Sequence, residues 1–127
     1  MKLMNILLIE DNEGDVILTT EALEETRLIK KLKVIKDGEA AIKFFEGIAA
    51  PADLPDIVLL DINLPKKSGH EVLAYLKAKE ELKHIPVIML TTSSSPKDIL
   101  LGNKNQVNCY LVKPLNVSIF KEIINKT

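Results

Sequence analysis

Five short apolar segments, separated by longer amphipathic stretches, limit what this chain can fold into. They predict strands at residues 3–9, 32–35, 57–62, 85–90 and 107–112. In most of them the apolar residues run on without alternation, which is typical of strands buried on both faces of a parallel sheet. The amphipathic stretches are predicted to be helices that cover this sheet on both sides. The pattern therefore predicts an α/β fold built from five strand–helix units.

Capping and turn residues mark where the helices begin. Helical spacing of apolar residues follows Asn12, and Asp37 opens a second helix. Ser68 begins a sequence with capping-box spacing, which predicts a helix from there to residue 82. Ser95-Pro96 places a proline at a first helical position, and a final amphipathic stretch near the C-terminus predicts the last helix.

Length and composition narrow the class of protein. The 127 residues are a usual length for one domain, and we expect a single domain over 1–127 with no output domain. The formal net charge of -1 predicts neither a nucleic-acid partner nor a polybasic contact with membranes. One cysteine, Cys109, distant in sequence from His70 and His84, predicts neither a disulfide nor a zinc site. No apolar run approaches the roughly 20 residues that span a bilayer, so a cytoplasmic protein is expected.

Acidic, hydroxyl and amino side chains stand where the predicted strands end. Glu10 and Asp11 follow the first strand, and Asp61 lies at the end of the third. Thr91 follows the fourth strand and Lys113 the fifth. Because the carboxyl ends of parallel strands meet at one edge of an open sheet, where ligands bind, we expect these five residues to form one site.

The residue types suit the chemistry of phosphoryl transfer. Carboxylates held close together repel one another, and burial raises the cost of ionising all of them. Mg²⁺ relieves that repulsion and is commonly held by one or two carboxylates, waters and a phosphate oxygen. An aspartate can attack a phosphoryl group to form an acyl phosphate, while a metal ion and a lysine neutralise charge on the phosphoryl oxygens. Thr91 supplies a hydroxyl donor for the phosphate once it has formed.

The order of these residues resembles that of the response-regulator receiver domains of two-component signalling. The resemblance covers the chain from residue 3 to its end and rests on the combination of Glu10-Asp11, Asp61, Thr91 and Lys113-Pro114. It implies a flavodoxin-like, doubly wound (βα)5 fold with strand order 2-1-3-4-5. It also implies that Asp61 accepts a phosphoryl group from a histidine kinase, so that the chain is a signalling phosphoacceptor and not an enzyme with a separate substrate.

The resemblance implies a set of ligands for Mg²⁺. Asp11 would coordinate the ion directly, together with a carboxylate oxygen of Asp61 and the backbone carbonyl of Asn63. Glu10 would act through a water molecule, and its length, where the family often carries aspartate, favours that indirect role. Lys113 would pair with the phosphoryl group.

A switch is implied as well. Thr91 would be the hydroxyl that follows the phosphate, and Tyr110 the aromatic ring that rotates inward when Thr91 moves. The peptide bond between Lys113 and Pro114 is expected to be cis, an option specific to proline. Asn63 and Ser93 are expected to tune the lifetime of the acyl phosphate by controlling the approach of water.

Narrower similarities suggest partners. Residues 9–15, 64–67 and 108–111 are similar to stand-alone regulators that serve phytochrome-type histidine kinases. The phosphorylated form is expected to bind a downstream protein or a second copy through the face of the fourth helix, fifth strand and fifth helix. Residues 102–106 are polar where many relatives carry small apolar residues, so a fourth helix that is either short or mobile is expected.

Three alternatives share features with this interpretation. A flavodoxin-like FMN carrier needs a phosphate-binding loop after the first strand, where this chain carries Glu10 and Asp11. An aspartyl phosphatase carries its nucleophile after the first strand and has a cap domain, whereas Asp61 follows the third. A pseudo-receiver, which binds partners without being phosphorylated, typically lacks an acidic residue, the threonine or the lysine, all of which are present here.

Overall fold

The computed structural model describes residues 3–92 and 109–125. Five parallel strands form one sheet in the order β2-β1-β3-β4-β5. This order confirms the predicted flavodoxin-like fold. The strands are β1 (Met4–Ile9), β2 (Ile29–Ile35), β3 (Ile57–Asp61), β4 (Val87–Thr91) and β5 (Cys109–Val112).

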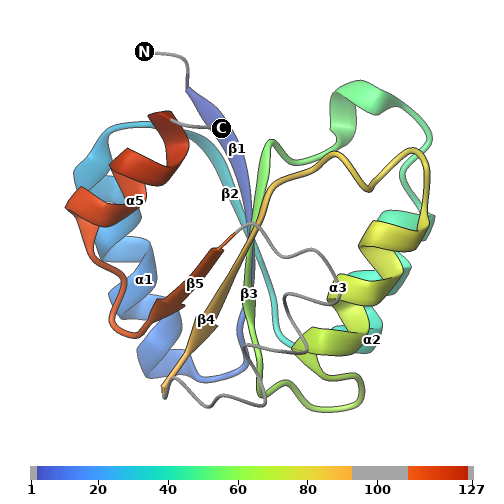
Figure 1. Ribbon diagram of the computed structural model, residues 1–127, viewed down its shortest axis with the longest axis horizontal. Helices are drawn as coiled ribbons and strands as arrows, with labels where there is room; N and C mark the ends of the chain where they lie inside the picture. The colour runs from blue at the N-terminus through green and yellow to red at the C-terminus, as the bar shows by residue number, and fades with distance from the viewer. Residues whose placement is uncertain (1–2, 93–108, 126–127) are drawn as a thin grey trace.

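Helices cover both sides of the sheet. Figure 1 shows the sheet nearly edge-on, with α1 and α5 on one side and α2 and α3 on the other. The helices are α1 (Glu13–Thr26), α2 (Gly38–Glu46), α3 (Gly69–Ala78) and α5 (Val117–Asn125), with a short 3-10 turn, η1 (Pro51–Asp53). The helix predicted from Ser95-Pro96, the polar segment 102–106 and Ser93 lie outside the described residues. Among the described helices none is both long enough and apolar enough to cross a membrane.

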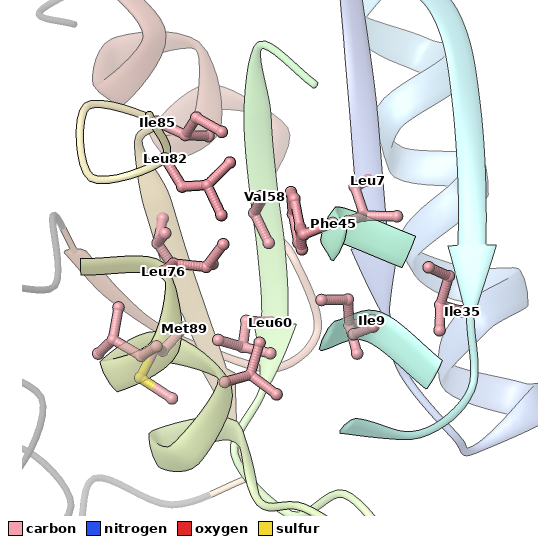
Figure 2. Close-up of a cluster of buried hydrophobic side chains, with 14 of the residues drawn as sticks. Leu7, Ile9, Ile35, Phe45, Val58, Leu60, Leu76, Leu82, Ile85 and Met89 are labelled. Carbon is pink, nitrogen blue, oxygen red and sulfur yellow. The ribbon is translucent and has the colours of Figure 1, made fainter. Parts of the chain in front are cut away.

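Apolar side chains alternate between two cores, one on each face of the sheet. In β3, Val58 and Leu60 belong to the core under α2 and α3, whereas Ile57 and Leu59 belong to the core under α1 and α5. Figure 2 shows the first of these cores, where side chains of the sheet meet Phe45 of α2 and Leu76 of α3. The uninterrupted apolar runs of the sequence follow from this arrangement, because both faces of the central strands are buried.

Two predicted boundaries were wrong by three residues or more, whereas the fourth strand begins two residues later than predicted, at Val87. The third helix ends at Ala78 and does not reach residue 82, because Lys79 adopts an extended conformation. The chain then turns back, and the Lys77 ammonium donates to the carbonyl oxygens of Lys83 and Ile85, both at 3.2 Å. Strand β2 begins three residues earlier than predicted, at Ile29. It lies at an edge of the sheet, where exposed lysines break the apolar pattern that marks the central strands.

The predicted helix starts are confirmed by their caps. Asn12 accepts from the Asp15 amide at 2.9 Å, and Asp37 accepts from the Ala40 amide at 2.7 Å. Ser68 forms both hydrogen bonds of the predicted capping box. Each of these helices begins just after the carboxyl end of a strand, so their N-termini surround the edge of the sheet that carries the candidate site.

Candidate functional site

Three carboxyl groups gather at the carboxyl ends of β1 and β3. Asp61 is the last residue of β3, and Glu10 and Asp11 follow β1 directly. Glu10 and Asp61 are buried, with exposed fractions of 0% and 4%, whereas Asp11 is exposed. Each of the three offers one carboxylate oxygen, and these oxygens all lie within 4.8 Å of one another. Two buried carboxyl groups and a third, exposed one therefore form an acidic cluster at this edge of the sheet.

Lys113, which follows β5, brings a positive charge to the acidic cluster. Its Nζ lies 2.5 Å from Oε1 of Glu10 and 3.4 Å from Oδ1 of Asp61. A third ion pair, 3.0 Å long, joins it to Oδ2 of Asp15 in the first turn of α1. The Lys113 amide also donates to the carbonyl oxygen of Thr91 at 2.7 Å, which ties β5 to β4 at this edge. The Lys113–Pro114 peptide is cis, as predicted.

The environment of Asp61 favours its protonated form when no cation is bound. Burial and the neighbouring Glu10 raise the pKa of Asp61 to about 7, against the opposing effects of Lys113 and of the Asn63 amide. That amide donates to Oδ1 of Asp61 at 3.3 Å. Burial alone would lower the pKa of Lys113, but its contacts with Glu10 and Asp15 and the charge of Asp61 raise it above its ordinary value. The lysine is therefore charged at neutral pH.

This donor set fits a hard divalent cation. Mg²⁺ prefers oxygen ligands and usually keeps several waters beside one or two carboxylates. The cluster supplies carboxylate oxygens close enough to share one ion, and the exposed Asp11 leaves a way in from solvent. A bound cation would also stabilise the ionised form of Asp61, which burial and Glu10 disfavour.

The remaining predicted residues of the described chain lie on β4, on β5 and in the segment after β3. Thr91 is the last residue of β4 and is buried, with an exposed fraction of 3%. Asn63 is exposed and follows β3 by two residues. Tyr110 is half-buried in β5 and packs against the core under α2 and α3. The structure thus gathers carboxylate oxygens of Glu10, Asp11 and Asp61 within 4.8 Å of one another and pairs Lys113 with Glu10 and Asp61. Thr91 and Asn63 lie at the same edge of the sheet.

Asp15 is the residue of this site that the sequence did not reveal. It ion-pairs with Lys113 although 98 positions separate them. The available signal was an acidic residue in the first turn of a helix that starts at the same edge as the strand ends. First-turn acids are common because they favour helix N-termini, so that signal alone does not distinguish a site residue from a helix-stabilising one.

Comparison with known proteins agrees with this geometry. Response regulator Rcp1 of Synechocystis sp. is 41% identical over 121 residues, which are 93% of this chain and 82% of Rcp1. A crystal structure of the Mn(2+)-bound form of Rcp1 covers 94% of this chain and 88% of its own, with a TM-score of 0.77 and 40% identity. The structure of the phosphorylated cyanobacterial phytochrome response regulator RcpA covers 98% and 90%, with a TM-score of 0.79 and 38% identity.

The profile of the response regulator receiver domain matches residues 6–125, almost the whole chain. That span includes both acidic residues after β1, the aspartate that ends β3 and the lysine after β5. The chain belongs to the receiver domain family of response regulators, the signalling proteins of phosphorelays.

Proposed function

We propose that Asp61 is the phosphoacceptor through which this receiver domain takes a phosphoryl group from a histidine kinase. The observation that carries the proposal is the position of the Asp61 carboxylate. It is buried, it lies 3.4 Å from the Lys113 ammonium, and it belongs to the same cluster as the carboxylates of Glu10 and Asp11. A carboxylate nucleophile that has both a lysine and a set of cation ligands beside it suits the transfer of a charged phosphoryl group.

The transfer follows from ordinary nucleophilic chemistry. A carboxylate oxygen of Asp61 attacks the phosphorus of the kinase's phosphohistidine, and an oxygen–phosphorus bond forms as the phosphorus–nitrogen bond breaks. The imidazole leaves with the electron pair and takes up a proton from solvent. Lys113 moves from its contact with Asp61 to pair with the phosphoryl oxygens, while Glu10 and Asp15 hold its ammonium near the site.

Mg²⁺ would be held by Asp11, Asp61 and the backbone carbonyl of Asn63, with Glu10 acting through water, and when bound it neutralises charge on the phosphoryl oxygens. Both Mg²⁺ and the ionised form of Asp61 are then required together.

Hydrolysis of the acyl phosphate, the reaction that resets the switch, needs a water to reach the phosphorus past Asn63. We propose that the exposed Asn63 side chain controls that approach, together with Ser93, which lies outside the described residues.

A switch completes the proposal. Thr91 donates its hydroxyl to the phosphoryl group, and Tyr110 turns toward the space that Thr91 leaves.

The single domain then signals by binding a downstream protein or a second copy through the face of the fourth helix, β5 and α5. Val112 of β5 and Ile119 of α5 are large apolar residues with exposed fractions of 52% and 43%. Because RcpA is a phytochrome response regulator, a phytochrome-type histidine kinase is the partner we propose.

The test is phosphorylation in a purified system. The protein is incubated with acetyl phosphate in the presence or absence of Mg²⁺, and its intact mass is compared with that of Asp61→Asn. We expect a phosphoryl adduct on the wild-type chain that requires Mg²⁺ and is absent from the variant. A folded wild-type protein that takes up no phosphoryl group from either acetyl phosphate or a phosphorylated kinase would contradict the proposal and favour a pseudo-receiver.

A further inference from the structure

The loop between β3 and α3 carries the Asn63 carbonyl that we propose as a metal ligand, and it is fixed at its base by a close backbone contact. The Gly69 amide donates to the Ile62 carbonyl oxygen at 2.9 Å and closes the loop of residues 63–68. A Cβ at position 69 would collide with the Asp61 carbonyl oxygen and approach the Ile62 Cα to 2.8 Å. Only glycine fits there, so the base of the loop is held against the phosphoacceptor's own backbone.

The tip of this loop is fixed to a different element, the N-terminus of α2. The Pro65 carbonyl oxygen accepts from the Lys67 amide at 2.8 Å within the loop and from the Gly38 amide at 3.3 Å across to α2. The three-residue turn that results puts Lys66 in the left-handed region, with φ 68°. Residues other than glycine rarely adopt that conformation unless surrounding contacts stabilise it, so this turn depends on its contacts with neighbouring residues.

Gly38 makes this contact possible because it has no side chain. A Cβ at position 38 would collide with the Lys67 carbonyl oxygen and lie 2.7 Å from the Lys67 carbonyl carbon. These are backbone atoms, which cannot move aside as the end of a flexible side chain does. Any larger residue must therefore push the tip of the loop away from α2 or distort the start of the helix. The nearby ion pair of Lys66 with Asp37, 3.9 Å long and largely exposed, is too weak to replace the contact.

We propose that Gly38 is a positioning residue for the metal site: the first residue of α2 holds the tip of the β3–α3 loop and thereby fixes the direction of the Asn63 backbone carbonyl. This inference rests on the proposed function, since it concerns how that site binds its cation. The loop is six residues long and is held at base and tip, so displacing the tip moves the residues between them. Nothing in the sequence spacing of Gly38 and Asn63 indicates this coupling.

The first test compares two glycine-to-alanine variants on the same helix. Gly38→Ala introduces the collision with Lys67, whereas Gly47→Ala, at the other end of α2, adds a methyl group whose nearest neighbour is the Lys43 carbonyl oxygen at 3.5 Å. Mg²⁺ affinity is measured by titration, following the backbone amide resonances of Asp11 and Asn63. We expect Gly38→Ala to bind Mg²⁺ at least about tenfold more weakly than wild type, the size of effect seen when a group that orients a metal ligand is lost. Gly47→Ala should bind it as wild type does.

The amide resonances also separate displacement from unfolding. In the metal-free Gly38→Ala protein, shifts should be confined to the start of α2 and to residues 62–69. A folded Gly38→Ala protein with wild-type Mg²⁺ affinity would overturn the proposal and leave the proposed function intact. If the wild-type chain itself bound no Mg²⁺, the proposed function would fail, and the positioning role would fail with it.

A second measurement uses the unmodified protein and so does not depend on a variant that folds. Coupling between two sites is reciprocal, so if the contact at Gly38 favours the metal-binding loop, Mg²⁺ must favour the contact. Adding Mg²⁺ should therefore slow hydrogen exchange at the Gly38 amide, which donates to Pro65. The Gly47 amide, which donates to the carbonyl oxygens of Lys43 and Phe44 at the far end of α2, is the internal control. Equal exchange at Gly38 with and without Mg²⁺, in protein shown to bind the ion, would contradict the inference.

Discussion

At the scale of single residues, the charge state of Asp61 links the stability of the protein to its chemistry. Burial and Glu10 raise its pKa to about 7, so in the metal-free protein at neutral pH a large part of this carboxyl group is protonated. The attack on phosphorus that we propose requires the carboxylate. A cation bound by the acidic cluster would therefore serve the proposed reaction twice, by neutralising phosphoryl charge and by favouring the ionised form of Asp61.

The raised pKa gives a prediction for stability in the absence of metal. In the unfolded chain Asp61 has an ordinary pKa of 3.8, whereas in the folded chain its pKa is raised to about 7. Folding thus takes up a proton between these values, and the contribution of Asp61 to the free energy of unfolding falls as pH rises through that window. Asp61→Asn carries no such cost. We expect the variant's advantage in stability over wild type to grow from pH 4 to pH 7 and then to level off, measured by urea denaturation with a chelator present.

Two controls apply to this measurement. Asp53→Asn removes an exposed carboxylate in η1 and should leave the pH dependence of stability close to that of wild type. Saturating Mg²⁺ should stabilise wild type more than Asp61→Asn, since a ligand that binds only the folded state raises its stability. Parallel pH profiles for wild type and Asp61→Asn would show that Asp61 ionises normally in the folded protein.

Some residues of the site could be predicted from the sequence and others could not. Glu10, Asp11, Asp61, Thr91 and Lys113 could be predicted because each follows a recognisable apolar strand, and the ends of parallel strands meet. Asp15 could not, because its role depends on the distance of α1 from the end of β5. The part of Gly38 in holding the β3–α3 loop was also hidden, because it lies in a backbone contact between elements.

At the scale of elements, the end of α1 shows a local conflict. Arg27 is the C-cap of this helix and adopts a left-handed conformation, with φ 59° and ψ 26°. Glycine is the usual residue there because it has no Cβ to oppose that conformation. Arg27 therefore adopts this conformation because the chain turns into β2 two residues later, although an arginine does not favour it.

A glycine at this position should show the conflict directly. We expect Arg27→Gly to unfold at a higher urea concentration than Arg27→Ala, with a free energy of unfolding about 1 kcal/mol greater, because both lose the guanidinium and only alanine keeps a Cβ in the left-handed region. At Glu24, inside the same helix, the order should reverse, with alanine more stable than glycine by about 1 kcal/mol. The same order at both positions would show that the left-handed conformation carries no cost.

At the scale of the whole molecule, two cores share the same strands. Alternate residues of β1, β3 and β4 enter the core under α1 and α5 or the core under α2 and α3. If the sheet comes apart on one side, the apolar side chains of both cores are exposed to water, because the same strands carry them. We infer that the described parts of the chain unfold as one cooperative unit, as small single domains usually do.

The two tyrosines of the chain allow this to be tested, because Tyr75 and Tyr110 both pack against the core under α2 and α3. Leu59→Ala makes a cavity in the opposite core and should lower the free energy of unfolding by about 3 kcal/mol. Tyrosine fluorescence and far-UV circular dichroism should then report one coincident transition. Leu18→Ala, at an exposed position of α1, should change stability by no more than about 0.5 kcal/mol. A tyrosine signal that kept its wild-type midpoint in Leu59→Ala would show that the two faces unfold separately.

The sequence by itself determined the fold class, the direction of the strands and the edge at which the site forms. It could do so because an uninterrupted apolar run and the polar residue that follows it are both visible within a few consecutive positions of the sequence. Only the tertiary structure decided the distances from Lys113 to Glu10, Asp15 and Asp61, the burial that raises the pKa of Asp61, and the contact between Gly38 and the β3–α3 loop. These quantities depend on how far separate elements stand from one another, and packing across the whole sheet sets that spacing.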